Sequence, residues 1–208
     1  MKPAEIESQS FQIIDAEAGP HHFSVQQWPV VRRMIHTSAD FEYLRSVRFH
    51  PQAVTQGIAA IRNAKTIITD THMARTGIRR SDLERYGVHV KCFIADPQIA
   101  EIAGSKQTTR AQAAVDAALK LMEGGIYVIG NAPTALLRLI TLVKADRAHP
   151  ALIIGLPVGF VNAAEAKAEL LTMDVPYITN TGRKGGSTVA AAVINALAIM
   201  AVEGGDEL

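Results

Sequence analysis

Four short stretches place glycine and polar residues directly after apolar runs, a combination that suits the binding of a large anion. They are residues 70–73 (Asp-Thr-His-Met), 130–134 (Gly-Asn-Ala-Pro-Thr), 155–160 (Gly-Leu-Pro-Val-Gly-Phe) and 182–187 (Gly-Arg-Lys-Gly-Gly-Ser). Glycine lets a ligand approach the backbone, while free N–H groups, arginine and lysine bind carboxylates or phosphates. Taken singly, each stretch is more simply a tight connection between a strand and a helix. Four of them at one edge of a sheet favour a binding site.

A titratable group with basic neighbours lies in residues 29–37, where His36 follows Arg32 and Arg33 by one helical turn. Neighbouring cations favour a neutral imidazole and an anionic ligand favours a charged one, so this side chain is suited to exchange a proton near neutral pH. A histidine that ends a helix and hydrogen-bonds its last carbonyls is an equally good interpretation. The other histidines have no metal-ligand spacing, and no metal site is predicted.

Arg110 follows Thr108 and Thr109, either of which suits the start of a helix. At that position Arg110 would clamp an anion, although an arginine on the solvent side of an amphipathic helix is a common alternative. The sequence contains no G-x-G-x-x-G, Walker A, G-x-S-x-G or H-E-x-x-H motif. A nucleotide cofactor and a serine nucleophile therefore have no support in the sequence.

Apolar runs at 66–69, 88–95, 126–129, 151–154 and 176–179 predict strands, with helical periodicity between most of them. The 126–129 run has no polar alternation, which is typical of a parallel strand covered on both faces. We therefore expect an α/β fold: a three-layer sandwich whose mainly parallel five-stranded sheet has helices on both faces. Residues 1–64 should be helical or irregular and pack on the sheet. One domain, 1–208, is expected.

The stretch 126–136 connects a strand directly to a helix. Gly130 allows the turn, Asn131 is a favoured N-cap, and Pro133 suits the first helical turn. The backbone donors of this turn would then face an anion at the carboxyl end of a central strand. Asn162 and Ser187 are expected to cap the helices that follow the later strands.

The composition limits the classes of partner. The 208 residues carry a formal net charge of +1 with no lysine or arginine run, which argues against nucleic acid. The single cysteine, Cys92, lies in an apolar run, so we expect a buried thiol, no disulfide and a cytoplasmic location. Residues 1–10 hold no signal-peptide segment. Residues 185–202 lack charge but are rich in alanine, which predicts a buried helix and not a membrane span.

Along nearly its whole length, the sequence resembles the precorrin-8X methylmutases of corrin biosynthesis, including the cobalt-precorrin-8 form. The residues that carry the resemblance are 29–37 (PVVRRMIHT), 69–78 (TDTHMARTGI), Thr109-Arg110, 130–136 (GNAPTAL), 157–161 (PVGFV) and 182–187 (GRKGGS). Their order and spacing together are highly specific for this family.

The resemblance implies an intramolecular transferase that moves a methyl group from C-11 to C-12 of precorrin-8X or cobalt-precorrin-8. The product would be hydrogenobyrinate or cobyrinate. The resemblance also implies no external methyl donor and no cofactor, with cobalt only as part of the substrate. It further implies a homodimer with active sites near the subunit interface, and His36 as the catalytic acid.

Such a substrate is a wide disc rimmed by carboxylates, so its site needs donors at the rim and an uncluttered floor. Arginines, helix N-termini and Arg183 or Lys184 would supply the donors, and glycines the floor. The residues that we assign to substrate binding are Ser10, Arg33, Thr71, Thr109, Arg110, Asn131, Thr134, Gly185, Gly186 and Ser187.

The sequence departs from the family pattern at two places. Ala111-Gln112 follow Arg110 where Ser-Ala is expected, and Ala166 stands where Ser is expected. Two alternative functions use the same features. One is a tetrapyrrole-binding carrier without catalysis, and the other is a nucleotide-dependent enzyme suggested by the sheet architecture alone.

Overall fold

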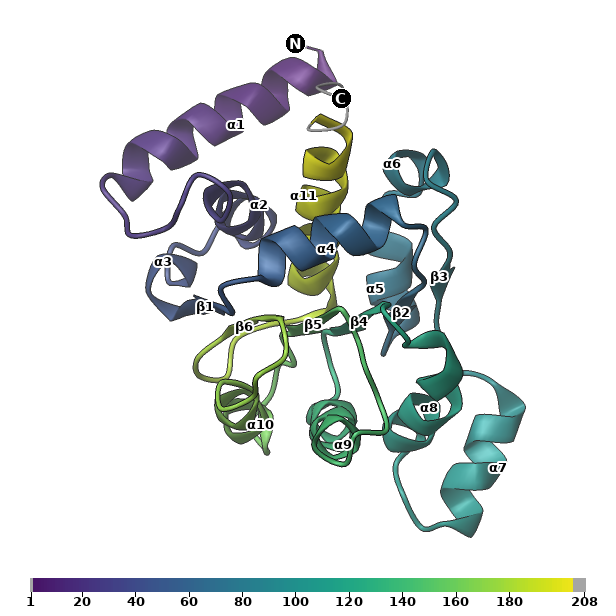
Figure 1. Cartoon of the computed structure of the whole chain (residues 1–208). Helices are drawn as coiled ribbons and strands as arrows, with labels where there is room; N and C mark the ends of the chain where they lie inside the picture. Colours follow the sequence, from purple (N-terminus) through teal and green to yellow (C-terminus); the bar gives the residue numbers. More distant parts are fainter. Residues whose placement is uncertain (1, 204–208) are drawn as a thin grey trace.

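A six-stranded sheet runs through the part of the chain that the computed structural model describes, residues 2–203 without the side chains of 3 and 4. Its strand order is β1-β6-β5-β4-β2-β3, and helices cover both faces (Figure 1). The strands are β1 (Val47–Phe49), β2 (Ile67–Thr69), β3 (Val90–Lys91), β4 (Ile126–Ile129), β5 (Leu152–Gly155) and β6 (Tyr177–Asn180). The expected α/β sandwich with a mainly parallel sheet is confirmed.

Two details of the sheet differ from the prediction. A sixth strand, β1, pairs antiparallel with β6, so that Val47 lies opposite Asn180. This strand falls inside the segment expected to be helical or irregular, because the alternation of apolar and polar residues over only three positions is too short to indicate a strand. Strand β3 has only two of the eight residues expected to be extended. The chain leaves the sheet after Lys91, and Cys92 is therefore half-buried, not buried as expected.

Helices form the two outer layers. Those drawn above the sheet in Figure 1 are α1 (Pro3–Ala18), α2 (Trp28–Ser38), α3 (Tyr43–Ser46), α4 (Ala53–Arg62), α5 (His72–Gly77), α6 (Ser81–Glu84) and α11 (Ser187–Glu203). Those below it are α7 (Pro97–Ser105), α8 (Arg110–Ala118), α9 (Pro133–Lys144) and α10 (Ala163–Leu170), with a 3-10 turn at Leu119–Leu121.

Alternate residues of the central strands serve the two layers, as the strand period of two requires. Ile126 and Val128 of β4 belong to the core shared with α2, α4 and α11. Tyr127 and Ile129 belong to the core shared with α8, α9 and α10. This two-sided burial confirms the expectation drawn from the unbroken apolar run.

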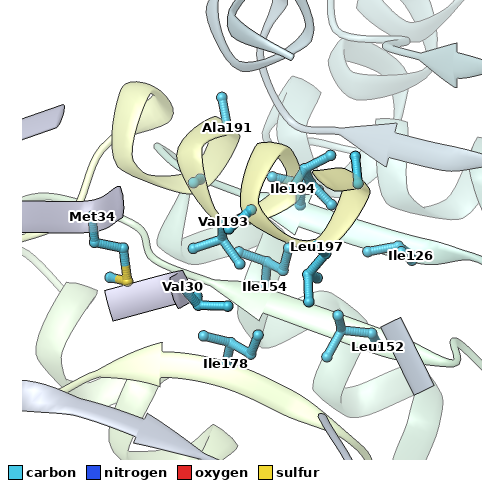
Figure 2. Packing of buried hydrophobic residues seen from close by; sticks show 14 of the residues in the cluster. Val30, Met34, Ile126, Leu152, Ile154, Ile178, Ala191, Val193, Ile194 and Leu197 are labelled. Atoms are coloured by element: carbon cyan, nitrogen blue, oxygen red, sulfur yellow. The ribbon is translucent and has the colours of Figure 1, made fainter. Parts of the chain in front are cut away.

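Helix α11 is the centre of the upper layer. It packs against α2, α4 and α5, and Figure 2 shows Val193, Ile194 and Leu197 packed over side chains of the sheet. Each such buried aliphatic side chain stabilises the fold by about 1.5–3 kcal/mol. The expected buried helix is confirmed, and no helix among residues 2–203 has the length and apolar character that crossing a membrane requires.

The parallel strands β2, β4, β5 and β6 bring the turns that follow them to one edge of the sheet. At this edge the start of α11 lies directly against the end of β4. A Cβ atom on Gly130 would lie 2.6 Å from Ser187 Cα and 2.9 Å from Ser187 N. Glycine is therefore required at 130, and the turns that carry the expected binding residues are in backbone contact.

We predict that Gly130→Ala destabilises the protein by about 1–3 kcal/mol, because the added methyl group would overlap backbone that cannot rotate away. Gly104→Ala is the matched control, since a Cβ atom at this exposed position in α7 meets nothing within 4 Å. It should be neutral or stabilising by about 0.5–1 kcal/mol, as alanine is favoured over glycine within a helix. Urea unfolding of both variants is the measurement. Equal losses would contradict the close-contact explanation.

Candidate active site

The carboxylate of Asp70 binds the turn between β4 and α9, at the edge of the sheet where the parallel strands end. Its buried carboxylate, 3% exposed, accepts hydrogen bonds from the backbone N–H groups of Gly130 at 2.9 Å, Asn131 at 2.8 Å and Ala132 at 2.8 Å. Burial raises the pKa of this carboxyl group, and the three amide hydrogen bonds oppose that shift. The start of α9 is therefore held by a side chain from the neighbouring strand β2.

This arrangement corrects the expected N-cap. Ala132 occupies the N-cap position of α9, and the Asn131 side chain, which is exposed, makes no capping hydrogen bond. A carboxylate from an adjacent strand is a stronger acceptor than a local amide oxygen, so Asp70 takes the donors. The amides that we expected to face a substrate are consequently already bonded. Asn131 contributes only its side chain to this edge.

Two pairs of hydroxyl groups bring four assigned residues together. Thr71 Oγ1 lies 2.8 Å from Ser187 Oγ and also caps α5 by accepting from Ala74 N at 3.1 Å. Thr109 Oγ1 lies 3.1 Å from Thr134 Oγ1, which links the starts of α8 and α9. Each pair joins segments that are far apart in the sequence. The edge therefore gathers hydroxyl groups from four elements, of which Ser187 is a buried residue.

The residue that departs from the family pattern after Arg110 has a structural role. Gln112 completes a capping box at the start of α8: its N–H donates to Thr109 Oγ1, and its side-chain oxygen accepts from Thr109 N, each at 3.2 Å. The predicted cap at Thr109 is confirmed, and Arg110 follows it as an exposed side chain. Asn162 also lies at an N-cap position, that of α10, but without the expected capping hydrogen bond.

The glycines of residues 182–187 form close backbone contacts with the turn after β5. Gly186 N donates to Leu156 O at 2.9 Å, and a Cβ atom on Gly185 would lie 2.3 Å from the same oxygen. Gly185 and Gly186 have φ values of +157° and +131°, which other residues rarely adopt. We call residues 181–186 the glycine loop. Helix α11 begins at Ser187 itself, directly after this loop, so the prediction that Ser187 precedes the helix as its N-cap is wrong.

Lys184, considered as a donor to substrate carboxylates, is bonded within the chain. Its ammonium group lies 2.6 Å from Asp40 Oδ2 and 2.8 Å from Glu42 Oε2, in the segment that follows α2. The hydrogen bond from Lys184 lowers the pKa of Asp40, although burial of that carboxyl group opposes the shift. The ion pair ties the glycine loop to the end of α2.

His36 lies in the last turn of α2 with its side chain exposed. Its ring meets the ring of Phe11 edge-on, with 5.2 Å between centroids. A hollow of about 290 Å³ beside it is lined by residues of α1, α2 and the following turn, including Ser10, Glu17 and Phe41. No hydrogen bond of the imidazole is present among the described residues. His36 therefore faces solvent next to Ser10.

Arg33 faces elsewhere. Its guanidinium group pairs with Glu7 Oε1 of α1 at 2.9 Å and lies 5.2 Å from the Phe11 ring centroid. It lines a separate hollow of about 320 Å³ between α1, α2 and α11. Within one chain, the assigned residues thus fall into two groups, with Arg33 held to α1. The helix group is Ser10 and His36, and the edge group at the strand ends is Thr71, Thr109, Arg110, Asn131, Thr134, Gly185, Gly186 and Ser187.

Comparison with known proteins identifies the family. The model of the family described as precorrin-8X methylmutase matches residues 5–200. The chain belongs to the precorrin-8X methylmutase family. It is accordingly an isomerase, an intramolecular transferase that moves a methyl group in cobalamin biosynthesis.

Individual relatives of this methylmutase match over nearly their full length. A cobalt-precorrin-8 methylmutase of Priestia megaterium is 50% identical, covering 98% of this chain and 91% of its own. A protein of the same name from Leptospira interrogans is 44% identical, covering 97% and 95%. The crystal structure of a precorrin-8X methylmutase from Thermus thermophilus has a TM-score of 0.90 at 46% identity and covers 97% and 98%.

Sequence reasoning about this methylmutase missed Lys167, Asn180 and the role of Asp70. Lys167 of α10 is fully buried, and its amine donates to Asn180 Oδ1 at 3.1 Å and to Lys184 O at 2.6 Å. Burial lowers its pKa to about 8. A lysine in an amphipathic helix normally faces solvent, so its position gave no signal. Ala166, the second departure from the family pattern, is fully buried.

We predict that Asp70→Asn destabilises the methylmutase by about 1–3 kcal/mol, since an amide cannot accept from all three N–H groups and turns its own NH₂ toward one of them. Asp96→Asn is the matched control, because Asp96 caps α7 at an exposed position by accepting from Gln98 N at 2.9 Å. Asparagine caps equally well, so this change should stay within about 0.5 kcal/mol. Urea unfolding distinguishes the two. A neutral Asp70→Asn would contradict the role given to Asp70.

Proposed function

We propose that the enzyme moves a methyl group from C-11 to C-12 of cobalt-precorrin-8 or precorrin-8X, giving cobyrinate or hydrogenobyrinate, with His36 as the acid. The observation that carries the proposal is the edge group: hydroxyls, glycines and exposed cations gathered at one side of the sheet, next to the end of the helix that bears His36. The relatives at 50% and 44% identity carry the cobalt name, which favours the cobalt-containing substrate.

The edge group suits a flat ring with carboxylate arms. Gly186 has open space where a side chain would stand, so a planar group can lie against its backbone, whereas Gly185 is packed against Leu156. Arg110 and Arg183 are exposed, and guanidinium groups bind carboxylates through paired N–H donors. Thr71, Thr109 and Thr134 add hydroxyl groups around the same surface, and the buried Ser187 hydroxyl bonds to that of Thr71. We assign the ring to this surface and its carboxylates to the arginines.

His36 would act as a general acid that donates a proton and later takes it back. The charged imidazole donates it to the macrocycle, where positive charge spreads over the conjugated system and lowers the barrier to migration of the methyl group. After migration the proton returns to the imidazole, so substrate and product have the same composition. A positioned acid contributes about 10²- to 10⁴-fold, and the remainder comes from orientation of the ring. This mechanism needs no nucleophile, and the sequence contains no motif of a serine nucleophile.

We infer that no resident cofactor or metal takes part and that any cobalt arrives within the substrate. Cytoplasmic location, with one half-buried cysteine in the chain, remains part of the same proposal. We also propose a homodimer with active sites near its interface. Phe160 and Val161, 84% and 77% exposed, form an apolar tip next to the edge group, with Arg183 5.5 Å from the Phe160 ring. A second copy that covered this tip would lie next to the site.

We predict that His36→Ala lowers turnover by at least about 10²-fold while the coloured corrinoid product still binds, because the acid is lost and the edge group is intact. His149→Ala removes another exposed histidine, which lies near Asp146 and just before β5, and should turn over like wild type. Turnover is followed from the visible spectrum after addition of cobalt-precorrin-8 or precorrin-8X. Near-normal turnover by His36→Ala would exclude His36 as the acid.

A second prediction concerns assembly. Wild type should sediment at twice the 22.4 kDa chain mass, and Phe160→Glu should shift it toward the monomer by placing a charge in an apolar contact. Val25→Glu is the control, because Val25 is 91% exposed and far in sequence from the edge group. Sedimentation velocity is the measurement. A monomeric wild type would refute the homodimer, and a dimeric Phe160→Glu would remove this tip from its interface.

A further inference from the structure

We propose that Lys167 is a positioning residue for the methyl migration, acting through Asn180 and Lys184 to fix the glycine loop relative to the end of helix α2 and thus to His36. The inference rests on the proposed role of His36. It concerns how the helix group is held against the edge group, which no catalytic assignment explains.

The surroundings of Lys167 are unusual for an ammonium group. It is fully buried, and the two groups that its amine contacts, the Asn180 side chain and the Lys184 carbonyl, are both neutral. A buried charge without a counter-ion is costly, and an apolar side chain of similar volume often gives an equally stable core. Burial leaves the pKa near 8, so the group still carries its proton at neutral pH. Stability alone therefore does not account for lysine here.

The hydrogen bonds of Lys167 and Asn180 hold the loop segment 181–184. The Lys184 carbonyl accepts from Lys167 Nζ at 2.6 Å and from Asn180 Nδ2 at 2.9 Å. Asn180, the last residue of β6, also donates to Thr181 O at 3.2 Å. Both ends of the loop segment 181–184 are thereby tied to buried side chains. The next residue is Gly185, whose unusual φ value begins the proposed floor of the site.

The side chain of Lys184 continues the connection in the other direction. Its ammonium group pairs with Asp40 and Glu42, and Asp40 lies four residues after His36. Helix α2 ends between them, at Ala39, which has a left-handed backbone. Lys184 thus accepts hydrogen bonds at its carbonyl from α10 and β6, and its side chain pairs with the segment that follows α2. Loss of either contact frees the last turn of α2 relative to the floor.

The test cuts this connection at two points and measures kcat and KM separately. Lys184→Met removes the ion pair at the surface, and Lys167→Met removes the buried donor while keeping the side-chain volume. Each should lower kcat by about 10- to 100-fold, since a displacement of about 1 Å costs roughly that much, with KM changed less than about threefold. The double variant should be no slower than the slower single variant, because both act on one connection.

Lys144→Met is the matched control. Lys144 of α9 pairs with Glu169 of α10 at 2.8 Å, so its loss also removes a lysine contact of α10 but leaves the glycine loop untouched. Its kcat and KM should stay within about twofold of wild type. If Lys167→Met fails to fold, Lys184→Met and the double change Asp40→Asn/Glu42→Gln still decide, because none of these three side chains is fully buried. The double change should reproduce the kcat loss of Lys184→Met, since it removes both carboxylates that pair with Lys184.

The outcomes separate this inference from the proposed function. In a His36→Ala background, Lys184→Met should cause no further loss, since the group that it positions is gone. Wild-type kcat for Lys184→Met and Lys167→Met, alongside an inactive His36→Ala, would refute the positioning role and leave the acid in place. A raised KM with unchanged kcat would also refute it, by showing that Lys184 serves binding. An active His36→Ala would instead refute the proposed function.

Discussion

The contact on which the site depends is that of the Asp70 carboxylate with three consecutive backbone amides at the start of α9. The carboxylate meets the positive end of the helix dipole, and its hydrogen bonds are charge-assisted. Without these donors a carboxylate that is 3% exposed would be strongly disfavoured. Because β2 and β4 are neighbours in the sheet, this contact fixes the turns after both strands at once. The Thr71–Ser187 and Thr109–Thr134 pairs flank those turns.

Most of the sheet was predictable because buried parallel strands read as unbroken apolar runs. Strand β4 and the strands on either side of it were located in this way. Strand β1 was not, since its pairing with β6 supplies what its own three residues do not signal. The N-cap prediction for α9 was wrong for the same reason. The capping rule considers only neighbours in sequence and predicted Asn131, whereas Asp70, 60 residues before Gly130, accepts the hydrogen bond. A local sequence pattern does not predict the cap where a residue distant in sequence is the stronger acceptor.

The sequence predicted which turns share an edge of the sheet better than it predicted the contacts that their side chains make. Residue types at strand ends correctly indicated that Thr71 and Ser187 would share one edge, because parallel strands must bring their carboxyl ends together. The ion-pair partners of the arginine and lysine side chains could not be predicted in this way. Arg33 pairs with Glu7 and Lys184 with Asp40, and each of these carboxylates lies in another element. Whether a cation is free for a ligand depends on the tertiary structure, which spacing does not encode.

The candidate site is divided between the end of α2 and the start of α11. This division explains why polar contacts matter in a protein whose centre is so apolar. Helix α11 begins at the edge group with Ser187 and packs along α2, so hydrophobic burial fixes the axes of both helices. Burial reaches α2 as far as Ile35 but does not fix residues 36–38, which are exposed, and the helix ends at Ala39. Helix ends open at a lower free energy than buried segments do. Directional contacts such as that of Lys184 with Asp40 must therefore supply the remaining precision, on which His36 would depend in its proposed role as the acid.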